Sequence, residues 1–439
     1  MNKKILDLAI PNIISNISIP LLGIVDMALM GRMESDAYIG AIALGSLIFN
    51  FIYWGLGFLR MGTSGFTAQA WGRKDRPETI LVFARAFFIA LVTSTLLLLL
   101  QQPIEWLSFV VLKGETRVEE LAMDYFRIRI WAAPAVLGQF ALLGFFLGMQ
   151  NARLPMVVLV STNVINLGCN FFFVIQLGMG SDGVALGTVV AQYSGLLIAL
   201  WIFRRKYGYL LKHWSMRATI QWNKLRNFLL VNSDIFIRTM CLVVVFSIFT
   251  ARSASSDVQS EGEETILAVN SLLMQFFMFF SFLIDGFAHA SEALTGRFIG
   301  AGDRHSLNKT VRLLFIWGTG ISILFTLIYL LGGHVIFRAL TNNQEVIANA
   351  RPYFFWIILV PMVSYAAFIW DGIYIGATAG PEMRNAMLIA TLAVFFPIYI
   401  IAGKFMGNHG LWLAFILFML ARGVTMQLYS GKAVFQKIP

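Results

Sequence analysis

The chain has 439 residues, of which 58% are hydrophobic and only 13% charged, and its formal net charge is +10. Soluble domains carry about 25% charged residues, so this composition excludes an ordinary water-soluble enzyme and indicates a polytopic membrane protein. The basic residues lie between apolar stretches, as topology signals do, so the positive charge does not indicate a nucleic-acid partner.

The apolar stretches are long enough to cross a bilayer as α-helices, which takes about 20 residues. We therefore expect an all-α integral membrane protein with twelve transmembrane helices. The expected spans are 8–31, 40–71, 79–102, 121–149, 155–178, 183–204, 226–250, 266–299, 309–333, 348–378, 384–403 and 409–431. Lysine and arginine gather in the loops of one side, whereas an opposite loop, 255–264, is acidic. The positive-inside rule then places both termini in the cytoplasm.

The first expected span contains one carboxylate, Asp26, in an otherwise apolar run. A charged side chain at the centre of a membrane helix costs about 2.5–3.5 kcal/mol on insertion scales, so such a residue indicates a functional site by default. Asn12 and Asn16 fall on the same helix face. We interpret this face as the wall of a cavity. A hydrogen-bonding seam between helices is the alternative for the two asparagines.

The fifth expected span repeats the polar pattern with Asn163, Asn166 and Asn170 at i, i+3 and i+7. Thr188 follows early in the sixth span, and Gln139 lies in the fourth. Amide side chains hydrogen-bond both carboxyl and carboxylate groups. We therefore expect these residues to line one cavity together with the carboxylate of the first span. Ordinary packing is the alternative for Gln139.

The second half of the chain carries a separate polar set. Its members are Asp234 and Arg238 in the seventh span, Asp285, His289 and Glu292 in the eighth, and Asp371 in the tenth. The three residues of the eighth span recur at i, i+4 and i+7, so we expect one stripe that faces the bundle interior. A structural network is the alternative for this stripe. For Asp234, the alternative to an ion-coupling role is a structural ion pair with Arg238 or with a neighbouring span.

The sequence contains no pattern that indicates catalysis. It lacks a phosphate-binding loop with lysine, and its His and Cys residues do not have metal-ligand spacing. The two cysteines, Cys169 and Cys241, lie in apolar runs. We therefore expect a protein that is not an enzyme and holds no cofactor and no structural metal.

An internal repeat divides the chain. The segment 144–156 matches 372–384 with an offset of 228, "GRKD" (72–75) lies opposite "GAGD" (300–303) with the same offset, and 179–187 matches 406–414 with an offset of 227. An even number of spans in each repeat makes the two halves parallel, as in many secondary transporters with a site near mid-membrane. We expect a six-helix bundle over 1–203, a basic cytoplasmic connecting loop over 204–226, and a second six-helix bundle over 227–439, with a central cleft.

Four stretches resemble the multidrug and toxic compound extrusion (MATE) family, in particular its DinF-like branch. They are "PLLGIVDMALMGR" (20–32), "FLRMGTSGFTAQAWGRKD" (58–75), "LGMGSDGVALGT" (177–188) and "LIDGFAHASEALTGRFIGAGD" (283–303). The resemblance implies two six-helix lobes and export of lipophilic cations coupled to inward H⁺ or Na⁺. It also implies that Asp26 is the proton-binding aspartate. Many proton-coupled relatives have a second aspartate where this chain has Asn170, so the resemblance leaves a site with a single carboxylate.

The residues and the resemblance together predict a secondary antiporter. We expect it to export amphipathic, often cationic compounds in exchange for H⁺, with Na⁺ as the alternative ion. It would act as a monomer in the bacterial inner membrane, without a nucleic-acid partner. One alternative is a flippase for lipid-linked precursors, which would need a cavity rich in Arg and Lys for pyrophosphate. The other is a scaffold that transports nothing, which would not need two homologous halves.

Overall fold

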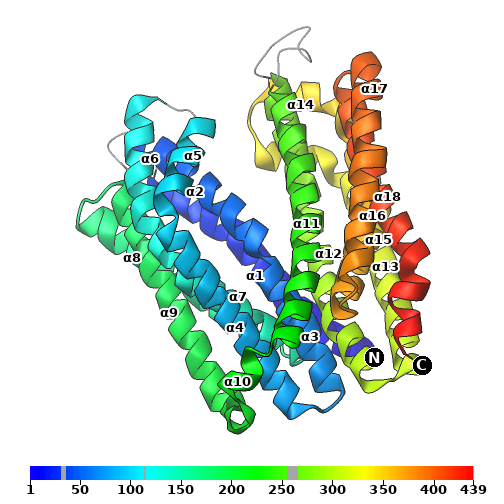
Figure 1. Cartoon of the computed structure of the whole chain (residues 1–439). Coiled ribbons are helices and arrows are strands. Elements are labelled where there is room, and N and C mark those ends of the chain that lie inside the picture. The colour runs from blue at the N-terminus through cyan, green and yellow to red at the C-terminus, as the bar shows by residue number, and fades with distance from the viewer. Residues whose placement is uncertain (31–35, 113–114, 255–264, 439) are drawn as a thin grey trace. The chain divides into compact units, whose positions relative to one another are not determined.

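The computed structural model describes residues 1–439 except 31–35, 113–114, 255–264 and 439, and it leaves out the side chains of 19, 21–30, 36, 265 and 334 as well. The described residues form helices and short connections, without a strand (Figure 1). Among the described residues, eleven helical stretches are long and apolar enough to cross a membrane. The 29-residue helix α1 (Asn2–Met30) precedes them and stays helical through Pro11 and Pro20. The expected all-α integral membrane fold is confirmed.

Packing divides the chain into two compact units, one over 10–232, the N-unit, and one over 1–9 with 233–439, the C-unit. Within the N-unit, α8 and α9 lie side by side, α7 packs on α3 and α4, and α6 contacts α2 and α9 (Figure 1). The elements of this unit after α1 are α2 (Asp36–Leu56), α3 (Phe58–Gly72), α4 (Arg76–Leu99), α5 (Gln101–Val111), α6 (Thr116–Arg129), η1 (Ile130–Ala132), α7 (Ala133–Gly148), α8 (Arg153–Asn170), η2 (Phe171–Gln176), α9 (Ser181–Tyr207), η3 (Gly208–His213) and α10 (Met216–Thr219).

The centre of the N-unit is an aromatic cluster contributed by three helices. Phe83 of α4 lies 4.6 Å from Phe203 of α9 between ring centroids, and Phe145 of α7 meets Tyr207 edge-on at 5.3 Å. Such pairs add about 0.5–1.5 kcal/mol each beyond area burial. The cluster fixes α7 against α4 and α9, the helix that also carries Thr188.

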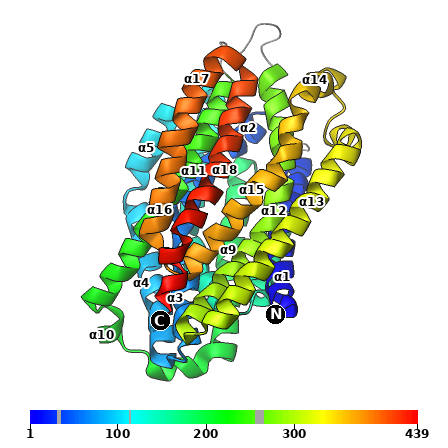
Figure 2. The same cartoon turned by 90° about the vertical axis from the view of Figure 1, so that its right-hand side faces the viewer.

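Helix α11 (Trp222–Ser253) begins in the N-unit and continues into the C-unit. In the C-unit, α15 packs on α12, α13 and α18, and α17 packs on α18 (Figure 2). Its remaining elements are α12 (Thr265–Ala301), α13 (Arg304–Leu340), α14 (Gln344–Ala350), η5 (Arg351–Tyr353), α15 (Phe354–Gly376), α16 (Gly380–Leu388), η6 (Ile389–Phe395), α17 (Phe396–Met406), α18 (Asn408–Ala433) and η7 (Phe435–Lys437).

The stretch 204–226, expected as a connecting loop, contains short helical elements. It holds the end of α9, the whole of η3 and α10, and the first residues of α11. Arg85 of α4 donates to the carbonyl of Ala218 in this stretch at 3.3 Å, and Lys224 lies 3.9 Å from Glu78. The stretch is therefore anchored to α4. A division into two six-helix bundles at this stretch stays a prediction.

The local structure of the two units repeats as the sequence offset predicts. Gly144 of α7 lies so close to the carbonyl of Arg60 that a Cβ atom would collide with it, and Gly372 of α15 stands in the same relation to the carbonyl of Ala288. Gly144 and Gly372 are 228 residues apart, and so are Arg60 and Ala288. Close backbone approach of two helices requires glycine at such a position. The repeated glycines are therefore explained by two equivalent helix crossings.

The starts of two helices repeat as well. Asp75 caps α4 by accepting a hydrogen bond from the backbone N–H of Glu78 at 2.9 Å, and Asp303 caps α13 by accepting one from Ser306 at 2.9 Å. These residues are again 228 apart. A carboxylate at the N-cap satisfies a backbone donor that the helix itself leaves without an acceptor. The motifs "GRKD" and "GAGD" are thus equivalent helix starts.

Candidate functional site

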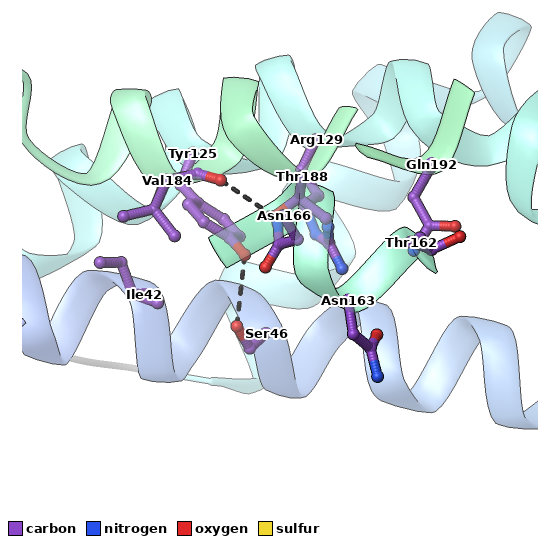
Figure 3. A pocket seen from close by; sticks show the side chains of 10 residues that line it. All are labelled: Ile42, Ser46, Tyr125, Arg129, Thr162, Asn163, Asn166, Val184, Thr188 and Gln192. Atoms are coloured by element: carbon purple, nitrogen blue, oxygen red, sulfur yellow. Dashed lines mark hydrogen bonds between the residues drawn. The ribbon is translucent and has the colours of Figure 1, made fainter. Parts of the chain in front are cut away.

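A pocket in the N-unit collects most of the polar residues of the fifth and sixth expected spans. Its volume is about 170 Å³, and α2, α6, α8 and α9 surround it (Figure 3). Hydroxyls, amides, one guanidinium and two aliphatic side chains line it: Ile42, Ser46, Tyr125, Arg129, Thr162, Asn163, Asn166, Val184, Thr188 and Gln192. A volume of this size accepts one polar group of a larger molecule.

Asn166, Asn170 and Thr188 are brought together by hydrogen bonds. Asn166 Nδ2 donates to Thr188 Oγ1 at 3.1 Å, and Asn170 Nδ2 donates to Asn166 Oδ1 at 3.3 Å. Asn170 is buried, and it closes α8 directly before the π-helical turn η2. A Cβ at Gly187 would collide with the Asn170 amide, so the absence of a side chain on α9 makes room for it.

The first helix is linked to the pocket by one hydrogen bond. Asn163 Nδ2 donates to Ser18 Oγ of α1 at 3.2 Å. Asn12 is buried and Asn16 half-buried on the same helix. The backbone of Asp26 belongs to α1, but its side chain lies outside the described residues. Its convergence with the asparagines therefore stays a prediction.

Gln139 lies behind the pocket wall. Its Nε2 donates to the carbonyl of Gln192 at 2.8 Å and to Gln192 Oε1 at 2.9 Å, which ties α7 to α9. Only 3% of Gln139 is exposed. Gln139 thus holds the side chain of Gln192, which does line the pocket, and it does not line the pocket itself.

Seven of the ten residues that line the pocket were not found from the sequence, among them Tyr125, Ser46 and Arg129. Tyr125 and Ser46 share a hydrogen bond of 3.3 Å between their hydroxyls (Figure 3). Arg129 ends α6, and Figure 3 shows its side chain reaching into the pocket beside Thr188 and Asn166. In the sequence, Arg129 lies inside the fourth expected span, 121–149, and was not singled out as a site residue. A charge followed by an unbroken apolar run was the signal that could have found it.

In the C-unit, Asp371 of α15 is bound by two arginines. It accepts hydrogen bonds from Arg238 of α11 and from Arg422 of α18, the latter at 2.6 Å. Arg422 and Asp371 are 2% and 5% exposed. The guanidinium groups of Arg238 and Arg422 and the carboxylate of Asp371 therefore form a buried network of ion pairs. Arg422 was missed from the sequence, although an arginine within the last apolar span requires a partner.

Asp234 and Arg238, one helical turn apart, do not pair with each other. Asp234 Oδ1 accepts a hydrogen bond from Arg384 Nη1 of α16 at 2.6 Å, while Arg238 binds Asp371. The expected pairing of Asp234 with a neighbouring span holds, and the pairing within α11 is wrong. The cause is that each residue has a nearer partner on another helix. This partner is Arg384 for Asp234 and Asp371 for Arg238.

The stripe on α12 is only partly connected. His289 Nδ1 lies 3.5 Å from Glu292 Oε2, and Glu292 is 1% exposed. Asp285 interacts electrostatically with Arg422. Glu292 thus faces the unit interior, as expected, whereas His289 is half-buried. Among the described residues, no group of three or more His, Cys, Asp or Glu side chains is arranged to hold a metal ion.

Comparison with known proteins gives consistent matches over most of the chain. The family model MatE matches residues 11–172 and 236–401. The DNA damage-inducible protein F of Escherichia coli (strain K12) is 36% identical over 97% of this chain and 91% of its own length. The multidrug and toxin extrusion protein 1 of Danio rerio is 22% identical over 94% of this chain and 69% of its own length.

Solved structures share the fold. A crystal structure of MATE in complex with MaD3S matches with a TM-score of 0.85 at 19% identity, over 99% of this chain and 96% of that chain. An outward-facing multidrug resistance transporter of the same family matches with a TM-score of 0.84 at 17% identity and the same coverage. At these identities the structures establish the architecture alone.

Proposed function

Because the chain belongs to the MatE family and is a multi-pass efflux transporter of small molecules, not an enzyme, we propose that it is an antiporter. It exports amphipathic, often cationic compounds in exchange for inward H⁺, with Na⁺ as the alternative ion. It acts as a monomer in a bacterial inner membrane with both termini in the cytoplasm. The E. coli relative and the basic loops of one side support this placement.

The observation that carries the proposal is the polar pocket of the N-unit. Asn163, Asn166 and Thr188 present amide and hydroxyl groups to this pocket. The chain as a whole is 58% hydrophobic. Polar groups buried in a membrane protein are costly unless they are satisfied, and they mark substrate or ion pathways. Ser18 connects this pocket to α1, the helix that contains Asp26.

In the proposed mechanism, Asp26 binds either a proton or a cationic substrate. Because the two ligands compete for one carboxylate, each lowers the affinity for the other to the same degree. Protonation from outside then releases the substrate. An inward proton contributes about 1.4 kcal/mol per pH unit, and about 2.3 kcal/mol per 100 mV for each charge moved.

Efflux from proteoliposomes under separately imposed H⁺ and Na⁺ gradients tests the proposal. Asp26→Asn keeps the size of the side chain and its hydrogen bonds but cannot ionise. We expect this variant to insert normally, to lose proton-driven efflux, and to bind cationic substrates without pH dependence.

Asp7→Asn is the matched control, because Asp7 lies exposed on the same helix. It should transport as the wild type does. Normal pH-dependent efflux by Asp26→Asn would refute the role of this residue, and efflux driven only by Na⁺ would refute proton coupling.

A further inference from the structure

Arg129 is a positive charge inside the N-unit pocket. It closes α6, within the stretch 116–148 that is long and apolar enough to cross a membrane. Its neighbours in the pocket wall include Asn163, Asn166 and Thr188 (Figure 3). The function proposed above assigns this arginine no role.

The guanidinium of Arg129 has no counterion among the described residues. Its Nε and Nη1 atoms are buried without a hydrogen-bond partner, and none of the described ion pairs includes it. It lies over the ring of Phe49, whose centroid is 5.6 Å from Cζ. A cation–π contact adds about 0.5–2 kcal/mol, which is less than the cost of keeping a guanidinium in the membrane.

Two other arginines of the N-unit have carboxylate partners. Arg85 is 3% exposed and donates to Glu78 at 2.8 Å. Arg127, two residues before Arg129 on α6, lies 2.8 Å from Glu105. Arg129 differs from these two in having no carboxylate partner among the described residues.

The pocket wall is suited to an anion. The described residues that line it include no acidic side chain, and Ser46, Tyr125, Asn163 and Gln192 carry hydroxyl or amide groups that can donate hydrogen bonds. Arginine binds carboxylates with paired, charge-assisted hydrogen bonds. At about 170 Å³ the pocket has room for a carboxylate and the adjoining atoms of a larger molecule.

We propose that Arg129 binds the carboxylate of an amphipathic substrate in this pocket. The transported compounds then include zwitterions and organic acids besides cations. This inference rests on the proposed function only in taking the pocket as a substrate site. Asp26 keeps its proposed role of binding either the proton or the cationic group of a substrate.

Binding of two matched dyes to the purified wild-type protein tests the inference without any ion gradient. Rhodamine B has a free carboxylate, and its ethyl ester is the same cation with that carboxylate blocked. A charge-assisted hydrogen bond corresponds to an affinity difference of about ten-fold or more. We expect rhodamine B to bind about ten-fold more tightly than the ester. Equal affinities would overturn the inference, and this comparison needs no variant that has to fold.

Two substitutions on α6 locate the carboxylate. Arg129→Gln should weaken rhodamine B binding about ten-fold and change ester binding less than two-fold, whereas Arg129→Lys should restore part of the preference. Arg117→Gln removes an exposed arginine of the same helix and should change neither affinity. A preference for rhodamine B that survives Arg129→Gln would overturn the assignment to Arg129. Because no coupling ion is involved, the outcome is independent of whether Asp26→Asn abolishes efflux.

Discussion

Arg384 Nη1 donates to Asp234 Oδ1 at 2.6 Å, so this acid is paired between helices and not along its own helix. The side chain of Asp234 is 8% exposed and that of Arg384 is 33% exposed. The pair therefore connects a buried carboxylate with a half-buried guanidinium of α16. The same carboxylate lies against Gly380 at the start of α16, where a Cβ would press on it.

Arg384→Gln should lower the free energy of unfolding by about 1–3 kcal/mol, because it leaves the Asp234 carboxylate buried without its cation. The double variant Asp234→Asn with Arg384→Gln should lose less than Arg384→Gln alone. Thermal unfolding in detergent measures both. Arg304→Gln, at an exposed position of α13, is the control and should stay within about 0.5 kcal/mol of the wild type. Equal losses of unfolding free energy in the single and the double variant would show that an unpaired Asp234 carboxylate is not what destabilises Arg384→Gln.

Asp371→Asn should be strongly destabilising, by about 3–5 kcal/mol, because the buried guanidinium of Arg422 and that of Arg238 lose their shared carboxylate. The yield and melting temperature of the purified variant measure this loss. If the variant were as stable as the wild type but failed to transport, Asp371 would be an ion-coupling residue and not a structural one.

Gly187→Ala should displace the Asn170 amide, since the new methyl group meets the end of that side chain. We expect the protein to fold, because an amide can rotate away, and substrate affinity to fall about two- to ten-fold with the loss of one hydrogen bond. Dye binding to the purified protein measures it. Gly168→Ala on α8, where a Cβ meets nothing within 4 Å, is the control. Unchanged affinity in Gly187→Ala would remove Asn170 from the binding site.

Gly144→Ala and Gly372→Ala should each cost about 1–3 kcal/mol of stability, because the added methyl group collides with a carbonyl of the crossing helix. Gly320→Ala on α13 adds a methyl in open space and should be neutral or stabilising. Melting temperatures of the three variants make the comparison. A different sign for the two buried glycines would mean that the two helix crossings are not equivalent.

The helices and the repeat could be predicted from the sequence because they depend on local signals. Apolar length defines a span whatever its neighbours are. Glycines and a capping aspartate mark the same turns in both halves, as Asp75 and Asp303 show. The hydrogen bond between Asn166 and Thr188 could be anticipated as well, because consecutive spans of a bundle are close neighbours and each presents one polar face.

The partners of the charged residues could not be predicted in the same way. Arg238 and Asp234 satisfy the i, i+4 rule, yet each binds a residue more than 130 positions away in the sequence, Asp371 and Arg384. In a low-dielectric interior the nearest counter-charge determines the pairing, and only the tertiary packing brings it near. The charge of Arg129 inside the fourth expected span could have marked it, but only the tertiary structure shows that two of its guanidinium nitrogens are buried without a partner.

The two glycine crossings also show which part of the repeated architecture can vary between the two units. Gly148 and Gly376 face the carbonyls of Ser64 and Glu292, which are again 228 residues apart. The same backbone position thus carries a neutral hydroxyl in one copy and a carboxylate in the other. Because that contact is made by backbone atoms alone, each copy could change its side-chain chemistry without loss of its architecture.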